Sequence, residues 1–255
     1  MMPLRTDTDA SGWASLARRL ILAVQFLTLI PTPQVADVHP ADLSRSALFF
    51  PLVGVIVGCA VAVAVMLGGM INPAVAGLAG LLAWVAITGG LHLDGLGDVA
   101  DAFGAAHRNP ERFHEVLRDP HAGSFAVIAL TLQMAAKLVL IGSVAASGMV
   151  WALALIPAWA RWGAMFWSSA VPPLREGAAE RFSSHISLLS VAAWGLALAL
   201  ASAWVAPPLL AALAIVPALA AFWRWRLGGI TGDCLGASIE VTESLLLLVL
   251  LMRSA

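Results

Sequence analysis

Charged residues are scarce in this chain. Asp, Glu, Lys and Arg make up only 11% of its 255 residues, whereas an ordinary soluble domain carries about 25%. Between residues 46 and 93, a run of 48 residues contains none of the four. Such runs exceed the roughly 20 apolar residues that cross a bilayer as a helix. The composition excludes a soluble globular domain and indicates an integral membrane protein with the lipid bilayer as its partner.

Closely spaced cysteines and alternating strand patterns are missing as well. Cys59 and Cys234 are the only two cysteines and have no metal-ligand spacing, so neither a disulfide framework nor a zinc site is expected. The alternation of apolar and polar residues that a barrel strand needs is also absent. Helices are therefore expected, because backbone groups in lipid must be paired within their own segment. The net charge of −1 indicates no particular partner, and we expect no nucleic-acid binding.

The hydrophobic segments predict an all-α, polytopic membrane bundle that forms a single domain over residues 1–255. About 6–7 transmembrane helices are expected from segments of roughly 20 apolar residues. An N-terminal segment at 13–30 ends at Pro31 and Pro33, and we interpret it as an interfacial or re-entrant helix. Whether 239–252 spans is left open, because it is short and begins with Glu240. The expected helices lie near 48–70, 74–92, 124–146, 149–168, 187–205, 208–223 and 239–252.

Positive charge is confined to one side of this arrangement. The hairpin tips near residues 72, 147 and 207 carry no Lys or Arg. By the positive-inside rule, the opposite face is cytoplasmic. The arginines on that face are Arg18, Arg19, Arg45, Arg108, Arg112, Arg118, Arg175, Arg181, Arg224 and Arg226.

Two acidic segments interrupt the apolar chain and resemble each other. GGLHLDGLGDVAD at 89–101 aligns without a gap with GGITGDCLGASIE at 228–240, and Asp101 corresponds to Glu240. Ionisable residues near membrane depth are costly and are usually kept for handling ions, protons or substrates. The repeat suggests two related halves that face one site at the cytoplasmic boundary. Chance similarity in a chain rich in Gly and Leu is the alternative.

The spacing of the carboxylates suggests a metal site. In a helix, Asp94, Asp98 and Asp101 share one face, because they occupy positions i, i+4 and i+7. The second motif adds Asp233 and Glu240 at the i, i+7 spacing. Such oxygen ligands suit Mg²⁺ or Mn²⁺, especially when substrate phosphates complete the shell. We predict a Mg²⁺ site from these five residues, with solvated helix caps as the alternative.

Five further residues are candidates for substrate binding. Lys137 and Arg161 each interrupt an apolar helix, so pairing with the acidic cluster or with a polyanionic substrate is expected. Arg118 and Arg175 lie in polar loops and are suited to phosphate, although membrane-flanking arginines commonly serve topology. His92 is a candidate for holding a phosphate or a metal, with a hydrogen-bonded interfacial histidine as the alternative.

Three blocks of the sequence are similar to a known family. GGLHLDGLGDVADAFG at 89–104, LRDPHAGSFAVIAL at 117–130 and GGITGDCLGASIEVTE at 228–243 resemble blocks of the cobalamin (5'-phosphate) synthases, also called adenosylcobinamide-GDP ribazoletransferases. The resemblance covers most of the chain in order. It implies a Mg²⁺-dependent transferase of vitamin B12 biosynthesis, in the bacterial inner membrane with its site facing the cytoplasm. The oligomeric state, including a homo-oligomer, is left open.

The resemblance also implies a reaction. Adenosylcobinamide-GDP and α-ribazole, or its 5'-phosphate, give adenosylcobalamin, or its 5'-phosphate, and GMP, when a ribose hydroxyl attacks the phosphorus bound to cobinamide. Catalysis would rest on positioning and on charge neutralisation by metal. Asp98 and Asp101 are the expected catalytic carboxylates, with Asp101 as general base because it ends the array nearest the following loop.

Two other functions are compatible with parts of the sequence. An ion-coupled transporter would suit repeated broken helices and membrane carboxylates, but the acids here lie at one end of their helices on the positive side. A CDP-alcohol type of phospholipid transferase shares the spaced aspartates. In this chain, however, Asp101 is followed by Ala102 rather than Gly, and no Gly-x-x-Ala-Arg follows.

Overall fold

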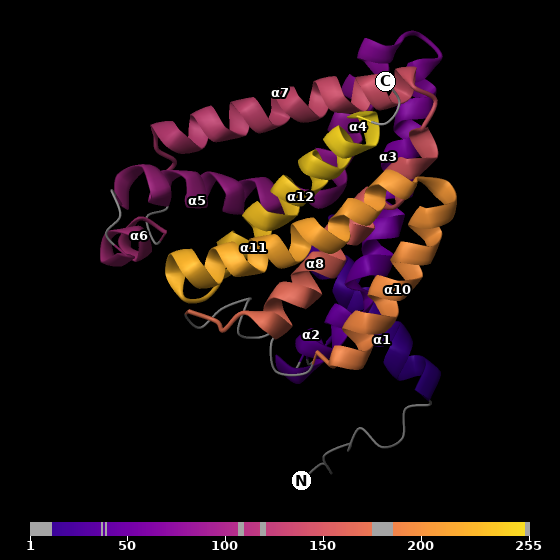
Figure 1. Ribbon diagram of the computed structural model, residues 1–255. Helices are drawn as coiled ribbons and strands as arrows, with labels where there is room; N and C mark the ends of the chain where they lie inside the picture. The colour runs from indigo at the N-terminus through magenta and orange to yellow at the C-terminus, as the bar shows by residue number, and fades with distance from the viewer. Residues whose placement is uncertain are drawn as a thin grey trace.

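Helices make up most of the chain in the computed structural model (Figure 1). The structure describes residues 12–36, 38, 40–106, 110–117, 121–174 and 186–252. Over those residues the only β pairing is an isolated bridge between Pro173 and Ile230, which confirms the all-α class. The elements are α1 (Gly12–Leu27), α2 (Pro40–Ser46), η1 (Ala47–Phe49), α3 (Phe50–Gly69), α4 (Pro73–Thr88), α5 (Leu91–Ala106), α6 (Pro110–Val116), α7 (Ser124–Ala146), η2 (Val150–Ala154), α8 (Ile156–Ala170), α10 (Leu188–Val205), η3 (Pro207–Ala211), α11 (Ala212–Leu227) and α12 (Gly232–Met252).

The bundle has enough long apolar helices to be polytopic, as predicted. Among the described residues, five segments are long and apolar enough to cross a membrane, and α4 with α5, bent by 89°, makes a sixth if counted as one broken span. The predicted span at 149–168 differs, because α8 has only 15 residues and follows the short 3-10 helix η2. The five segments are Ala41–Gly69, Ser124–Ala146, Leu188–Val205, Pro207–Leu227 and Gly232–Met252.

The first and last helices resolve two open points of the sequence. The 16-residue α1 is too short to count among the candidate spans. The last helix begins at Gly232, well before the expected start at 239, and is long enough to span. The hydroxyl of Thr231 accepts a hydrogen bond from the backbone N–H of Cys234 at 3.3 Å and so caps this helix. The two acids of the second motif, Asp233 and Glu240, therefore lie within this long helix rather than before it.

Helix α8 lies inside the bundle and is tied to its neighbours by tryptophans. The indole N–H of Trp159 donates to the Ser202 hydroxyl at 2.9 Å, which connects α8 to α10. Trp167 donates to the carbonyl of Val216 at 2.8 Å, which connects it to α11. Buried indoles need such partners for their polar edge. These bonds fix α8 and place its polar residue Arg161 in the interior.

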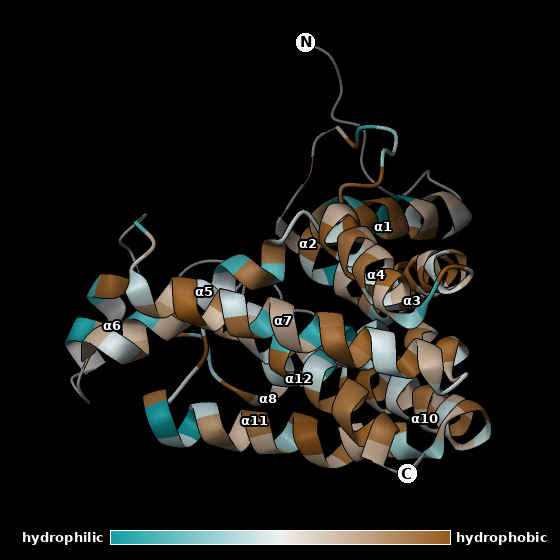
Figure 2. Ribbon diagram, turned by 90° about the horizontal axis from the view of Figure 1, so that it is seen from above, coloured by the Kyte–Doolittle hydropathy of each residue, from teal (hydrophilic) through white to brown (hydrophobic). Residues whose placement is uncertain are grey.

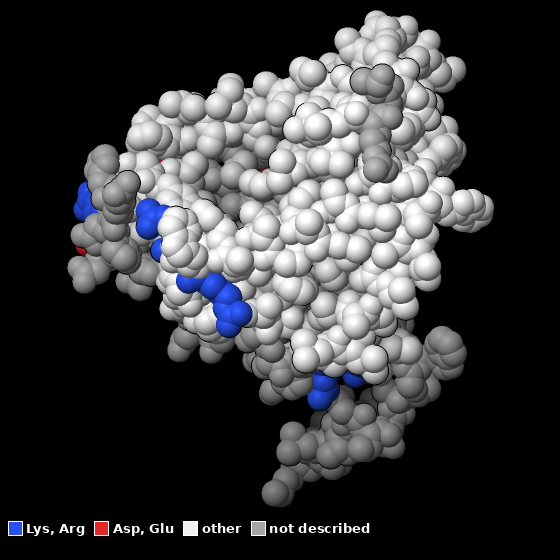
Figure 3. Space-filling view, viewed as in Figure 1, with Lys and Arg blue, Asp and Glu red and all other residues white. Residues whose placement is uncertain are grey.

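The outer surface is apolar over much of its area and charged at one side. Trp204 and Met70 are 90% and 83% exposed, as expected for side chains that face lipid. Hydrophilic residues gather at α6 and at one end of α11 (Figure 2). In Figure 3, the Lys and Arg side chains visible on this face lie along its left and lower margins, while the upper right, where α3 turns into α4, is uncharged.

Candidate functional site

The two acidic motifs pack directly against each other where α5 crosses α12. A β-carbon added to Gly95 would lie 2.9 Å from the carbonyl oxygen of Asp233, and one added to Gly236 would lie 3.3 Å from the carbonyl oxygen of His92. A β-carbon at Gly95 would force the two backbones apart, and one at Gly236 would make a tight contact, so glycine at both positions favours this close approach. The expectation that the two motifs meet is confirmed by these contacts.

The repeat in the sequence is partly a repeat in local structure. Gly89 ends α4 and Gly228 ends α11, and both have left-handed backbones, with φ of 62° and 73°. Glycine is favoured at such helix ends because it has no β-carbon. Each motif thus stops one helix and begins the next, which brings its first aspartate, Asp94 or Asp233, into the first turn of the new helix.

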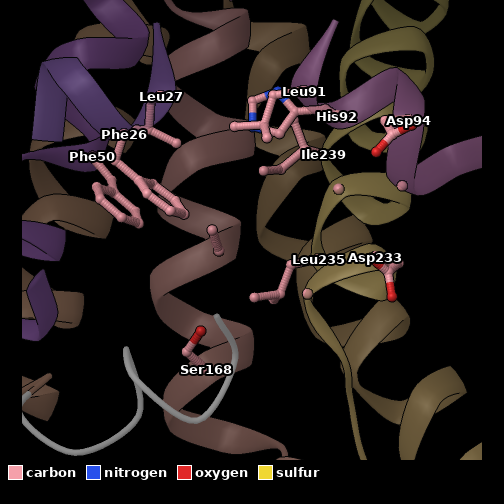
Figure 4. A pocket seen from close by; sticks show the side chains of 14 residues that line it. Phe26, Leu27, Phe50, Leu91, His92, Asp94, Ser168, Asp233, Leu235 and Ile239 are labelled. Atoms are coloured by element: carbon pink, nitrogen blue, oxygen red, sulfur yellow. The ribbon is translucent and has the colours of Figure 1, made fainter. Parts of the chain in front are cut away.

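A cavity of about 260 Å³ opens beside this crossing (Figure 4). Asp94 from α5 and Asp233 from α12 lie at one side of it, and Phe26 and Phe50 lie at the other. The remaining residues that line it are Leu27, Leu91, His92, Gly95, Ala164, Ser168, Gly232, Leu235, Gly236 and Ile239.

A second and more open hollow, of about 520 Å³, adjoins the first. The two share Phe26, Leu91 and Asp94, so the Asp94 carboxylate lies at their border. The second hollow is more polar, and its lining includes Gln25, Thr28, Thr88, Gly89 and Gly90. A site with two compartments around one carboxylate is suited to bringing two ligands together.

Asp94 and Asp233 are the acids that the structure brings to one cavity. Within the described part of the chain, no three His, Cys, Asp or Glu side chains are gathered closely enough to hold a metal ion. Magnesium nevertheless keeps several waters and commonly uses one or two carboxylates together with substrate phosphates. The pair therefore fits a magnesium ion whose shell is completed by a phosphate substrate, but not an all-protein site.

Asp101 has a different set of contacts. Its Oδ2 accepts the backbone N–H of Gly123 at 2.5 Å, and its Oδ1 accepts that of Ala126 at 2.9 Å. The carboxylate thus caps the N-terminus of α7 and is 9% exposed. Asp98, one turn earlier, is half-buried. The catalytic and metal roles of Asp98 and Asp101 stay predictions.

Glu240 turns toward a buried cluster of charges instead of toward Asp94. Lys137, the only lysine of the chain, has its Nζ 2.8 Å from Glu240 and 2.6 Å from Glu243. Arg161 forms an ion pair with the other oxygen of Glu243. Lys137, Arg161 and Glu243 are 2%, 0% and 0% exposed. The predicted pairing of Lys137 and Arg161 with acidic residues is confirmed, and Glu240 is their partner rather than a neighbour of the cavity aspartates.

The cluster is balanced and largely hydrogen-bonded. Two cations face two anions, which buried charges require. Gln133 donates from Nε2 to Glu240 at 2.7 Å, and the Lys137 ammonium lies 4.4 Å from the centre of the Trp84 ring. Glu243 is a residue that we did not predict. Its signal in the sequence was its place one turn after Glu240 in the same apolar run.

His92 links this cluster to the cavity. A terminal nitrogen of Arg161 lies 3.2 Å from Nδ1 of His92, which also lines the cavity. A guanidinium can only donate, so Nδ1 must accept and the proton of a neutral imidazole must sit on Nε2. The contact thereby sets the tautomer of a histidine at the edge of the site. Arg118 and Arg175 lie outside the described residues.

Known proteins resemble the chain over nearly its whole length. Residues 19–251 match the family model described as cobalamin-5-phosphate synthase. The adenosylcobinamide-GDP ribazoletransferase of Thiobacillus denitrificans is 52% identical over 235 residues, which cover 91% of this chain and 94% of that protein. Those of Laribacter hongkongensis and Novosphingobium aromaticivorans are 52% and 45% identical, over 91% of this chain and 96% and 95% of theirs. No solved structure matches.

Proposed function

The chain belongs to the cobalamin-5-phosphate synthase family, and from this premise we propose that it joins adenosylcobinamide-GDP to α-ribazole or α-ribazole 5'-phosphate. The products are adenosylcobalamin, or its 5'-phosphate, and GMP. Curated relatives that carry the ribazoletransferase name are up to 52% identical and align over nearly their full length, which supports this activity.

The observation that carries the proposal is the meeting of Asp94 and Asp233 at one cavity. One carboxylate comes from each acidic motif, and Asp94 also borders the second hollow. A transferase that joins two substrates must bring their reacting groups, here a phosphate and a hydroxyl, to one place, and the border between the two hollows is such a place. We propose that these two aspartates hold Mg²⁺ together with substrate phosphate. The ion would neutralise charge on the pyrophosphate of adenosylcobinamide-GDP.

The protein's own residues then orient the reacting groups. A ribose hydroxyl of α-ribazole attacks the phosphorus attached to cobinamide, the bond from that phosphorus to GMP breaks, and the hydroxyl loses its proton. His92, with its proton on Nε2, is placed to donate to a phosphate oxygen. Lys137 and Arg161 are buried with carboxylate partners, so we assign them to positioning rather than to direct substrate contact.

We also propose that the site faces the cytoplasm from the bacterial inner membrane. The support is the charge distribution, because Arg112, Arg224 and Arg226 lie on α6 and the end of α11, while the uncharged tips lie at the other side. Substrates that carry phosphates would then reach the site from the cytoplasm without crossing the bilayer.

Production of GMP and cobamide by the purified protein in nanodiscs tests the function. With both substrates present, we expect product that depends on added Mg²⁺. Asp94→Asn and Asp233→Asn should each lower turnover by about 100-fold or more, as expected when a charge that acts in the transition state is removed. The matched control is Asp42→Asn on α2, which should keep wild-type turnover. Folded wild-type protein that makes no product would refute the proposal.

A further inference from the structure

The cavity beside Asp94 has the walls of a site for an aromatic ring. The rings of Phe26 and Phe50 lie nearly parallel, with centroids 6.0 Å apart and planes 3° apart. Leu235 and Ile239 of α12 face them across the space. The polar side chains of the lining are few. Apolar walls with a small number of convergent polar groups are the usual make-up of a pocket for a small organic ligand.

The size of the cavity limits which ligand it takes. Pockets for drug-sized molecules occupy about 300–1,000 Å³, and this cavity of about 260 Å³ lies just below that range. It has room for a bicyclic base but not for a corrinoid. Under the proposed function, two such bases come to the site, the guanine of adenosylcobinamide-GDP and the benzimidazole of α-ribazole.

The chemistry of the walls distinguishes the two bases. Guanine carries hydrogen-bonding groups around most of its edge, and leaving any of these unpaired against Phe, Leu or Ile is unfavourable, because the group loses its hydrogen bonds to water without gaining another. A dimethylbenzimidazole has a mostly apolar edge and would lose little on leaving water. We propose that this cavity binds the base of α-ribazole, an inference that rests on the proposed function.

This placement also fits the geometry of the reaction. With the base between Phe50 and Leu235, the ribose leaves the cavity on the side where Asp94 and Asp233 lie. Its hydroxyl is then next to the carboxylates. The second hollow, beyond Asp94 and lined by Thr28 and Thr88, stays open for the other substrate, whose phosphates then lie at the border of the two spaces beside Asp94.

Filling the cavity tests the assignment. Ala164 of α8 lines it and is nearly buried, so Ala164→Leu places a larger side chain in the space. We expect the KM for α-ribazole to rise about tenfold or more, while the KM for adenosylcobinamide-GDP stays within about twofold. The matched control is Ala192→Leu, at an exposed position of α10, which should leave both values unchanged.

Each result of these measurements either supports or overturns the assignment of the cavity to the base of α-ribazole. A rise confined to adenosylcobinamide-GDP would assign the cavity to guanine and overturn the proposal, and so would no change in either KM. If Ala164→Leu does not fold, Ser168→Leu fills the same cavity one turn later, and binding of α-ribazole alone, followed by its own fluorescence, gives a readout without turnover. Turnover by the wild-type enzyme tests the proposed ribazoletransferase function, whereas the filled variants test the assignment of the cavity. A wild-type enzyme that makes cobamide while the filled variants bind α-ribazole normally would refute this inference alone.

Discussion

Arg161 contacts His92 and Glu243 at once, with one terminal nitrogen 3.2 Å from Nδ1 of His92 and the other paired with the Glu243 carboxylate. Its side chain is fully buried, so both contacts persist without competition from water. A residue buried in the bundle thereby determines how a histidine at the cavity presents its proton.

Replacing Arg161 by lysine should separate these two contacts. An ammonium can still pair with Glu243, but it offers a single nitrogen and cannot also reach His92 in the forked geometry of a guanidinium. We expect kcat to fall about tenfold with little change in either KM, because positioning of one hydrogen-bond donor is lost. Steady-state kinetics with both substrates measures this. Arg112→Lys, at an exposed site on α6, is the control, and unchanged kcat in Arg161→Lys would contradict the positioning role.

Removing Lys137 should destabilise the fold more than it changes substrate binding. Lys137→Met removes the cation that pairs with both Glu240 and Glu243 and leaves Arg161 paired with Glu243. Breaking a buried ion pair costs about 3–5 kcal/mol. Denaturation in detergent, followed by tryptophan fluorescence, would show the lower free energy of unfolding. The double variant Lys137→Met with Glu240→Gln should recover part of the loss. Equal stability of Lys137→Met and wild type would show that the cluster is not held by this lysine.

Two substitutions of Asp101 separate capping from catalysis. Asp101→Ala removes both bonds to the start of α7 and should lower stability by about 1 kcal/mol, the usual value of an N-cap. Asp101→Asn keeps one oxygen acceptor for the cap but cannot take up the proton of the attacking hydroxyl, so turnover is lost if Asp101 is the general base and is retained if it only caps α7. Thermal unfolding and GMP release, measured on both variants, distinguish the roles. If Asp101→Asn is folded but inactive, the predicted general-base role is correct.

The crossing of α5 and α12 should not tolerate a β-carbon at Gly95. Gly95→Ala would press against the Asp233 backbone at 2.9 Å, and such overpacking costs about 1–3 kcal/mol. Because the helices must move apart, turnover should fall as well. Gly97→Ala, on the same helix, meets only the side chains of Ala126 and Leu130 at 3.4 Å and should behave like wild type. If both variants have equal activity, close contact of the motifs is not needed for function.

The sequence predicted the helical class, the charged side and the contact of the two motifs, because each follows from strong local signals. A charge-free run of 48 residues is typical of segments that cross the bilayer. The gap-free similarity of the segments at 89–101 and 228–240 suggested that the two motifs face one site. The cost of burying Lys137 and Arg161 also predicted that they would be paired.

The orientation of individual carboxylates was beyond the sequence. The i, i+7 spacing placed Asp101 on the same face as Asp94, but the spacing does not say which helix packs against each turn of that face. In the structure, α7 meets Asp101, and the Lys137 of α7 meets Glu240. The segment at 149–168 was expected to span the membrane, and the short length of α8 was not predicted for a similar reason. Apolar residues buried against protein and apolar residues facing lipid look the same in a sequence.

The glycine contact between α5 and α12 has a consequence for biosynthesis. Gly95 leaves the ribosome 138 residues before Asp233 (233 minus 95), so the first motif enters the membrane long before its partner exists. A nascent chain has no complete site until α12 has been inserted and has docked on α5. Under the proposed function, a chain that ends before α12 lacks one of the two cavity aspartates, and we expect it to be inactive until synthesis is complete.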